Sequence, residues 1–252
     1  MNDIKERRLT LQERERYNRQ MLIQGWGETG QLKLRNAKVT IAGAGGLGNP
    51  ASIYLAAAGV GRITLIDNDR YELSNLNRQI LGCEQDIGRP KVDAAKEKLF
   101  ALNPAVQVNA QNKTIKADNV DALIKGSDVV IDAMDNWATR YILNKACIDN
   151  RIPLVHAGIQ GLSGQITTII PGKGPCLQCL IPKPPPEVRP FPVLGATPGL
   201  FATLQVMEAI KLVLGRGETL VGRLFLLSGE DMTCNIVRIS RNLDCPACGK
   251  LK

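Results

Sequence analysis

A glycine-rich segment is the first candidate for chemistry in this sequence. Residues 43–48 read GAGGLG and lie between the apolar run KVTI and a run of small residues. Glycines at a strand-to-helix turn let backbone N–H groups approach a phosphate closely at the start of a helix. Asp67 ends the next apolar run, about 20 residues farther on, where an acidic residue can accept a hydrogen bond from a ribose. We therefore predict a nucleotide site that includes Gly43, Gly45 and Gly46, in preference to a close-packed helix start without a ligand.

The residues after Asp67 form a group of polar and charged side chains. Asp69, Asn75 and Arg78 occur in NDRYELSNLNRQIL, and Lys91 follows in RPKV. Cations beside a nucleotide suit phosphoryl or nucleotidyl transfer, because they offset charge on the phosphates in the transition state. The sequence has no GK[ST] motif, so the glycine turn is not a P-loop.

Two acidic residues end a later apolar run. DAMDN places Asp132 and Asp135 at this point, and Asp135 could hold Mg²⁺ together with substrate phosphates. A further cation, Arg19, belongs to the N-terminal segment. The only histidine, His156, lies in the strand-like segment PLVHAGI, and we expect it in the core. A dehydrogenase commonly needs a general acid such as histidine, so an NAD-dependent oxidoreductase is the less favoured alternative.

The chain has seven cysteines, and four of them form two CxxC pairs. In a chain without secretory features, such pairs indicate metal or redox chemistry before structural disulfides. The pairs are Cys176 with Cys179 and Cys245 with Cys248, and together they look like a tetrahedral four-cysteine zinc site. The long interval between the pairs weakens this signal, and a redox-active CxxC is the alternative.

The elements that must position these residues alternate between strands and helices. Apolar runs predict strands at 38–43, 62–67, 106–115, 128–135 and 153–159. Periodicity and small-residue composition predict helices at 49–58, 90–102, 119–126 and 138–150. This alternation is typical of an α/β fold with a Rossmann-like, doubly wound and mostly parallel sheet. Ligands of such sheets bind beyond the carboxyl ends of the strands, where the glycine turn, Asp67 and Asp135 are expected.

The pattern changes in the C-terminal part of the chain. Antiparallel strands are predicted at 165–172, 223–229 and 234–240. A proline-rich stretch at 182–192 predicts an extended crossover on the surface. The apolar stretch 193–214 is interrupted by Pro198, Glu208 and Lys211, which indicates a buried helix near 199–214 rather than a membrane span.

The whole chain, 1–252, is predicted to form a single domain with three parts. The first part, 1–36, is expected to be helical and amphipathic, with Leu9, Leu11, Tyr17, Met21 and Leu22 among its apolar residues. A nucleotide-binding half at 37–160 and a further half at 161–252 follow. We see no internal repeat in the sequence.

The composition is that of a soluble globular protein, with 44% hydrophobic and 22% charged residues. The net charge of +8 comes from scattered lysines and arginines without a basic tract, so nucleic-acid binding is not expected. The N-terminus, MNDIKERRLTLQERERYNRQ, is dense in charge and has no apolar core. We therefore expect no secretory signal, no membrane association and a cytoplasmic location.

Taken together, the motifs resemble the MoeB/ThiF/HesA family, relatives of the ubiquitin-activating enzymes. The resemblance runs over nearly the whole chain and rests on RYNRQ, GAGGLG, LIDND with SNLNRQ, GRPKV, DAMDN, GPCLQC, LQVMEAIK and CPACG, which occur in the family's order. It implies ATP-dependent adenylylation of the C-terminal glycine carboxylate of a small ubiquitin-like sulfur carrier protein ending in Gly-Gly. Pyrophosphate would leave, and the carrier would serve molybdopterin, thiamine or another sulfur-transfer route. The half at 161–252 would then bind the carrier.

The resemblance also assigns roles to individual residues. Asp135, Arg78, Lys91 and Arg19 are expected to be catalytic, with Asp135 near Mg²⁺ and Arg19 reaching into the site of a neighbouring subunit in a homodimer. The nucleotide-binding residues are expected to be Gly43, Gly45, Gly46, Asp67, Asp69, Ser74, Asn75, Arg78, Lys91, Asp135 and Asn136. The four paired cysteines, Cys176, Cys179, Cys245 and Cys248, are expected to bind Zn²⁺.

The sequence departs from some members of that family in its cysteines. The stretch KPPPEVRPFPVLGATPG contains none, so a covalent bond to the carrier on the crossover is not expected. Cys83 is the only candidate nucleophile left, although a buried free thiol is the favoured interpretation; Cys147 and Cys234 are expected to be packed. No rhodanese domain follows CPACG, so a separate protein must donate sulfur. A non-catalytic subunit that binds nucleotide or carrier is the alternative to an enzyme.

Overall fold

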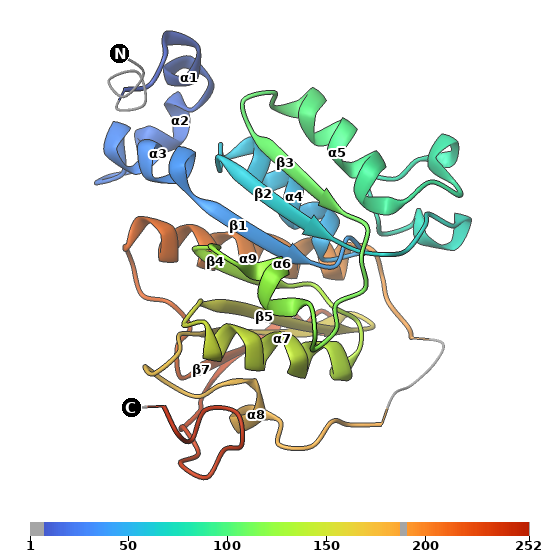
Figure 1. Ribbon diagram of the computed structural model, residues 1–252, viewed down its shortest axis with the longest axis vertical. Coiled ribbons are helices and arrows are strands. Elements are labelled where there is room, and N and C mark those ends of the chain that lie inside the picture. Colours follow the sequence, from blue (N-terminus) through green and yellow to red (C-terminus); the bar gives the residue numbers. More distant parts are fainter. Residues whose placement is uncertain (1–7, 187–190, 252) are drawn as a thin grey trace.

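The computed structural model describes residues 8–186 and 191–251 (Figure 1). Its helices are α1 (Leu11–Arg16), α2 (Asn18–Met21), α3 (Gly27–Asn36), α4 (Gly48–Ala57), α5 (Lys91–Leu102), α6 (Val120–Ile124), α7 (Trp137–Asp149), α8 (Leu177–Leu180) and α9 (Ala196–Leu214). Its strands are β1 (Lys38–Ala42), β2 (Arg62–Ile66), β3 (Gln107–Gln111), β4 (Val129–Asp132), β5 (Leu154–Gln160), β6 (Ser163–Ile169), β7 (Arg223–Ser228) and β8 (Thr233–Arg238). Two short 3₁₀ helices, η2 (Leu73–Asn75) and η3 (Glu84–Asp86), follow β2.

The strands form one eight-stranded sheet in the order β3-β2-β1-β4-β5-β6-β7-β8. The first five strands in this order are parallel, and β5 through β8 pair antiparallel. The predicted fold class is therefore confirmed, including the change to antiparallel pairing after Gly161. The chain moves outward from β1 to β2 and β3, then returns to place β4 on the other side of β1. Loops that leave β1 and β4 in opposite directions open a crevice at their carboxyl ends, where such sheets bind ligands.

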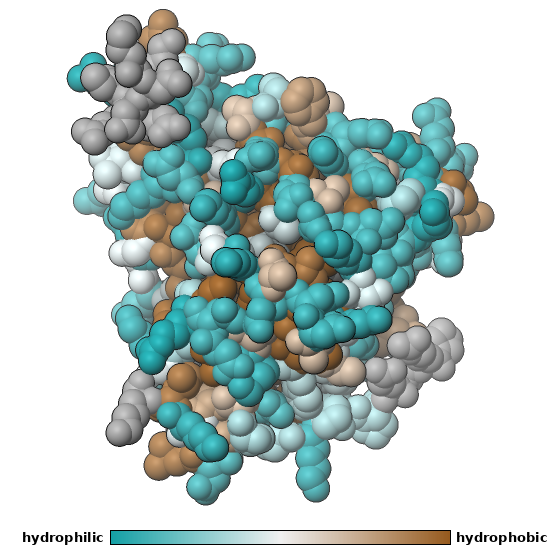
Figure 2. All heavy atoms as spheres, viewed as in Figure 1, coloured by the Kyte–Doolittle hydropathy of each residue, from teal (hydrophilic) through white to brown (hydrophobic). Residues whose placement is uncertain are grey.

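Helices cover both faces of the sheet (Figure 1). One core is built from alternate strand residues such as Ile41, Leu65 and Ile131, which pack under α4, α5 and α9. The second core joins the intervening residues, Val130 among them, to α6, α7 and α8. Strands covered on both faces read as continuous apolar runs, which is why the strand positions were visible in the sequence. The face in Figure 2 is largely hydrophilic, with hydrophobic residues in scattered groups.

Helix α9 has the length and apolar composition of a membrane span, and within the described residues it is the one helix that does. Half of the most apolar stretch of this helix is buried inside the protein. Phe201 and Ala202 are fully buried, and the helix packs against α4 and strands β4 to β6. The prediction of a buried helix here is confirmed, although α9 begins at Ala196, so Pro198 lies in its first turn.

Several predicted boundaries were wrong. The strand predicted at 128–135 ends at Asp132, because the Asp132 side chain accepts a hydrogen bond from the Met134 N–H (3.0 Å) and turns the chain. The strand predicted at 106–115 ends at Gln111. The N-terminal segment forms three short helices, in which Leu11 and Leu22 are exposed; residues 1–7 of that prediction, and 187–190 of the predicted crossover, lie outside the described residues.

Replacing Gly48 tests how tightly the glycine turn is packed. A Cβ atom at Gly48 would lie 1.8 Å from the carbonyl oxygen of Gly43, so the backbone would have to move. We expect Gly48→Ala to lower the free energy of unfolding by about 2 kcal/mol or more in urea titrations. Gly199, which lies in α9 with open space around it, is the matched control. Gly199→Ala should be neutral or stabilise by up to about 1 kcal/mol; equal losses in both variants would contradict the argument.

Candidate active site

The glycine turn connects β1 to α4 at the carboxyl edge of the sheet. Gly43 has φ +103°, and a Cβ there would lie 2.5 Å from the Ala133 carbonyl oxygen, so the loops after β1 and β4 touch at this point. Only glycine combines this φ with so close an approach. Gly46 faces Pro198 and the Arg78 side chain, and Gly45 faces the Gln79 amide. The structure therefore gathers segments from β4, α9 and the region after β2 around the predicted turn.

Asp67 joins the glycine turn to the loop after β2. Its Oδ2 accepts a hydrogen bond from the Ala44 N–H (2.7 Å), and its Oδ1 accepts one from the Asp69 N–H (2.8 Å). Burial raises the pKa of Asp67, and it outweighs these two hydrogen bonds and the nearby Lys91, which lower it. Each carboxylate oxygen keeps a second lone pair, so Asp67 can still accept a hydrogen bond from a ribose hydroxyl.

Asn49, which the sequence analysis did not single out, fixes the turn from beneath. Its Nδ2 donates to the Ala44 carbonyl (2.6 Å), and its Oδ1 accepts from the Leu81 N–H (2.8 Å). The side chain is fully buried and thereby ties the glycine turn to the chain that follows Arg78. The sequence carried one sign of this role, since Asn49 is a polar residue among the small and apolar residues at the start of the helix.

The segment that begins at Ser74 places Arg78 against the turn. The Arg78 guanidinium donates to the Ser74 carbonyl (2.8 Å) and to Asn77 Oδ1 (2.9 Å). Asn75 is buried and accepts from the Glu72 N–H (3.2 Å), which closes the 3₁₀ turn of η2. A groove of about 270 Å³ reaches Arg78 from the outer face of α4 and α9. Ser74 is exposed beside these groups.

Lys91 begins α5 and is nearly buried, yet its charge is paired. Its Nζ lies 3.0 Å from Asp69 Oδ2, and the Lys91 backbone N–H donates to the Asp69 carbonyl (2.9 Å). The ammonium is therefore held close to Asp67, whose carboxylate it influences. The structure thus brings Asp67, Asp69 and Lys91 together, as the sequence predicted.

Asp135 and Asn136 lie between β4 and α7, on the same edge of the sheet. Asn136 caps α7, because its Oδ1 accepts from the Thr139 N–H (2.9 Å). Its Nδ2 donates to Asp135 Oδ1 (3.3 Å), the one side-chain contact of Asp135 within the described residues. The Asp135 carboxylate is exposed to solvent and so is open to a ligand.

Beneath Asp135 lies a buried ionic cluster of Asp132, Arg140 and His156. Asp132 Oδ2 contacts His156 Nδ1 at 2.7 Å and Arg140 Nε at 3.7 Å. Burial raises the pKa of Asp132, but Arg140, His156 and the Met134 N–H outweigh it, and the net pKa is lowered. Burial lowers the pKa of His156 despite the adjacent carboxylate, so His156 is neutral near pH 7. The expectation of a core histidine is confirmed, and sequence reasoning missed Arg140.

Arg19 is the one predicted catalytic residue that this chain does not bring to the glycine turn. It lies on α2, and its neighbour Gln20 donates to the Ala58 carbonyl at the far end of α4 (2.8 Å). Helix α4 is about 15 Å long at 1.5 Å per residue and begins at the turn. Arg19 is exposed, without an ion-pair partner among the residues that the structure describes.

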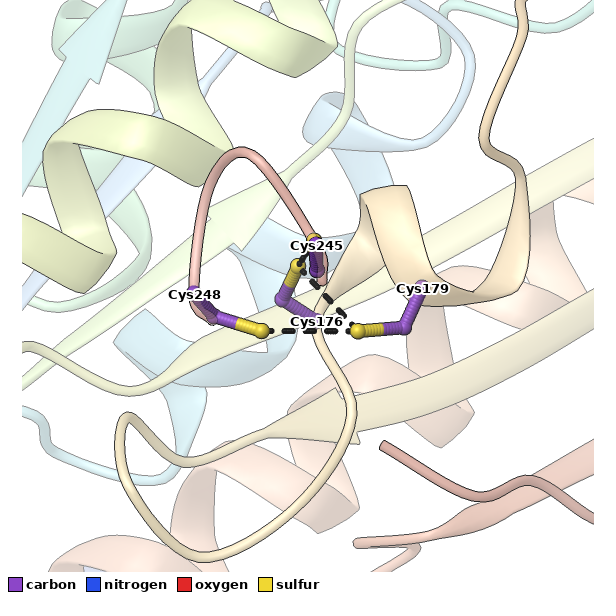
Figure 3. Close-up of side chains that lie close together, drawn as sticks. All are labelled: Cys176, Cys179, Cys245 and Cys248. Atoms are coloured by element: carbon purple, nitrogen blue, oxygen red, sulfur yellow. Dashed lines mark hydrogen bonds between the residues drawn. The ribbon is translucent and has the colours of Figure 1, made fainter. Parts of the chain in front are cut away.

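The four paired cysteines converge (Figure 3). Cys176 immediately precedes α8, Cys179 lies within it, and Cys245 and Cys248 lie in the C-terminal loop. All four sulfur atoms lie within 4.8 Å of one another, and three of the separations are 3.4, 3.5 and 3.9 Å. Tetrahedral Zn–S bonds of 2.3 Å place sulfurs about 3.8 Å apart. The cluster therefore has the size and ligand set of a structural zinc site.

The remaining cysteines differ in part from expectation. Cys147 is buried as predicted, whereas Cys83 and Cys234 are exposed. Cys234 lies on β8, where all six residues are exposed because β8 contributes to neither of the two cores. Cys83 precedes η3, and its Sγ donates to Asp86 Oδ2 (3.0 Å) beside Lys98. Both predictions of a packed thiol were wrong.

Comparison with known proteins identifies the family to which the chain belongs. The sequence model of the ThiF family matches residues 17–247. The chain belongs to the ThiF family.

Individual relatives are similar over nearly their whole length or over one part. The chain is 44% identical to a SAMP-activating enzyme E1 of Haloferax volcanii, over 94% of this chain and 89% of the relative. It is 42% identical to the adenylyltransferase and sulfurtransferase MOCS3 of Culex quinquefasciatus, over 92% of this chain and 55% of the relative. A crystal structure of E. coli MccB with ATP superimposes with a TM-score of 0.81 at 27% identity, over 93% of this chain and 74% of MccB.

The buried histidine predicts a pH dependence of stability. A histidine whose pKa is lowered in the folded state stabilises the fold above its unfolded pKa of 6.5. That contribution is lost as the pH falls, because the unfolded chain binds the extra proton. Below about pH 6.5, we expect the free energy of unfolding to fall more steeply in the wild type than in His156→Gln, by up to about 1.4 kcal/mol per pH unit. Urea titrations from about pH 7.5 to 5.5 measure both slopes. Parallel slopes would contradict a neutral His156, and no second histidine complicates the comparison.

Proposed function

We propose that this protein is an adenylyltransferase that activates the C-terminal glycine carboxylate of a small ubiquitin-like sulfur carrier protein. The observation that carries the proposal is the convergence of the glycine turn, Asp67, Arg78, Lys91 and Asp135 at the carboxyl edge of the sheet. The relatives support it, since one is named an adenylyltransferase, another a SAMP-activating enzyme, and a third holds ATP in its crystal structure. The same comparisons argue against the NAD-dependent alternative.

The chemistry requires cations but no general base. A glycine carboxylate is already ionised at neutral pH, so one of its oxygens can attack the α-phosphorus of ATP directly. The bond from that phosphorus to the bridging oxygen breaks, and pyrophosphate leaves with the electron pair. Two anions must meet in this step, and Arg78 and Lys91 offset their charge. Asp67 is proposed to hold the ribose, and the backbone at Gly46 to approach the nucleotide.

Around these groups, Gly43, Gly45, Asp69, Ser74, Asn75 and Asn136 complete the proposed nucleotide site. Asp135 is proposed to hold Mg²⁺ with the ATP phosphates, and the ion would supply further positive charge to the leaving pyrophosphate. An exposed carboxylate suits this role, because it can replace one water ligand of the ion without a change in packing.

Arg19 is proposed to act in the site of a second copy of the chain, in a homodimer with composite sites. Its place at the opposite end of α4 from the glycine turn supports this assignment, since its own site is too far away. The single domain, 1–252, is proposed to consist of the helices at 1–36, the nucleotide-binding half at 37–160 and the carrier-binding half at 161–252. A separate protein is proposed to donate the sulfur.

Pyrophosphate exchange tests the reaction. We expect the full chain, with Mg²⁺ and ATP, to exchange labelled pyrophosphate into ATP only when a carrier ending in Gly-Gly is present. Asp135→Asn should lower exchange by about 100-fold or more. A panel of carriers for molybdopterin, thiamine and other routes identifies the pathway. ATP binding without exchange for any carrier would favour the non-catalytic binding subunit.

Mixing two inactive variants tests the composite site. Arg19→Ala and Asp135→Asn homodimers should each be inactive, but a heterodimer of the two contains one site with both wild-type residues. After subunit exchange at equal concentrations, half the dimers are heterodimers, so about a quarter of wild-type activity should return. A mixture that stays inactive, although native mass spectrometry shows heterodimers, would place Arg19 in its own chain's site or outside catalysis.

Zinc removal tests the cysteine cluster. The purified chain should contain about one zinc per chain, and Cys245→Ser should lower the free energy of unfolding by more than about 2 kcal/mol. Cys234→Ser, which removes an exposed thiol outside the cluster, is the matched control and should change neither value. Full metal content in Cys245→Ser would contradict the assignment, as would a disulfide between the pairs.

A further inference from the structure

The position of Asp135 must come from its backbone, because its side chain is exposed and its one hydrogen bond within the described residues is with Asn136. The residue before it, Met134, is held at both of its peptide groups. The Met134 N–H donates to Asp132 Oδ1 (3.0 Å). The Met134 carbonyl accepts two hydrogen bonds from Arg140, from Nε (3.1 Å) and from Nη2 (2.6 Å). Rotation of the chain at Met134 would break all three bonds.

Arg140 is itself fixed from several sides. It is 7% exposed, its guanidinium lies 4.9 Å from the centre of the Trp137 ring, and its Nη2 also donates to the Ala157 carbonyl on β5 (3.3 Å). It is the fourth residue of α7, near a helix N-terminus, where the helix dipole disfavours a cation. The Asp132 carboxylate and the two carbonyls offset that cost.

The two oxygens of Asp132 have different partners. Oδ2 faces His156 and Arg140, which leaves Oδ1 for the Met134 N–H. The register of the sheet sets this arrangement, because Asp132 and His156 are paired residues of β4 and β5. The Asp132 carbonyl accepts from Gln205 of α9 (2.8 Å), so the strand end is also held from the other face.

We propose that Asp132 and Arg140 are positioning residues that fix the Met134 backbone and so set the place of the Asp135 carboxylate in the nucleotide site. The pair acts through Asp135 and touches no substrate. The catalytic part of this inference rests on the proposed adenylylation, whereas the structural part does not. Because misplacing a reacting group by about 1 Å can cost 100-fold in rate, the pair should affect turnover more than binding of ATP.

Arg140→Met is the main test, in the full chain. Amide-resolved hydrogen exchange by NMR should show faster exchange of the Met134 N–H, with β4 and β5 still protected. In pyrophosphate exchange, kcat should fall by about 10- to 100-fold, while KM for ATP changes by less than about threefold. Arg140→Lys keeps a charge beside Asp132 but lacks the planar pair of donors. Arg140→Lys should show smaller changes in the same two measurements. It keeps the test decisive if Arg140→Met does not fold.

Arg62→Met is the matched control. It removes an arginine that donates to Gln107 Oε1 (2.9 Å) at the amino end of β2, and it should leave both measurements unchanged. Unaltered hydrogen exchange of the Met134 N–H in the Arg140 variants would overturn the proposal. Faster hydrogen exchange throughout β4 and β5 would overturn it as well. A wild type that exchanges no pyrophosphate with any carrier would overturn the proposed function instead, and the amide measurement would still decide this inference.

Discussion

The Asp67 carboxylate joins the loop after β1 to the loop after β2. One oxygen holds the N–H of Ala44 in the glycine turn, and the other holds the N–H of Asp69 after β2. Lys91 is fixed through Asp69, and Arg78 lies against the same turn at Gly46. Asp69 and Lys91 therefore take their positions, directly or through one neighbour, from this carboxylate. Burial raises its pKa, but its backbone donors favour the ionised form.

The second support of the site is the contact between the loops after β1 and β4. It requires the absence of a side chain at Gly43, since the Ala133 carbonyl occupies the space of a Cβ atom. The glycine turn consequently serves its own sheet as well as the proposed approach to a nucleotide. The first purpose holds whether or not a nucleotide is bound, which is why a structural test at Gly48 is separate from a test of function.

Much of the fold was visible in the sequence, because strands buried on both faces leave apolar runs and their loops leave glycine and aspartate. The predicted strand ends were wrong where a side-chain hydrogen bond ends the strand. The Asp132 side chain accepts a hydrogen bond from the Met134 N–H and turns the chain, and the hydrophobic pattern of the sequence does not reveal that bond. The exposure of Cys234 was missed because the sequence pattern does not tell which strand lies outside both cores.

Within the site, residues that follow a strand directly were predictable. Arg140 was not, since it acts on the Met134 and Ala157 carbonyls, which only the folded chain brings near it. The pairing of Asp132 with His156 depends on the register of β4 and β5, and a lone sequence does not contain register explicitly. The nucleotide-binding roles of the predicted residues remain predictions, but their common location at one edge of the sheet supports them.

The cysteine cluster also shapes the topology of the C-terminal half. A metal held by all four thiolates closes a loop that runs from Cys179 to Cys245 and contains α9, β7 and β8. Closing a loop of this length lowers the entropy of the unfolded chain by the equivalent of roughly 4 kcal/mol, on the argument used for covalent cross-links. With that metal bound, the segment 179–245 would be a closed ring rather than a linear segment. A single proteolytic cut within that ring would open it. The fragment before the cut would stay joined by the backbone, and the fragment after it would stay joined by Cys245 and Cys248 through the metal.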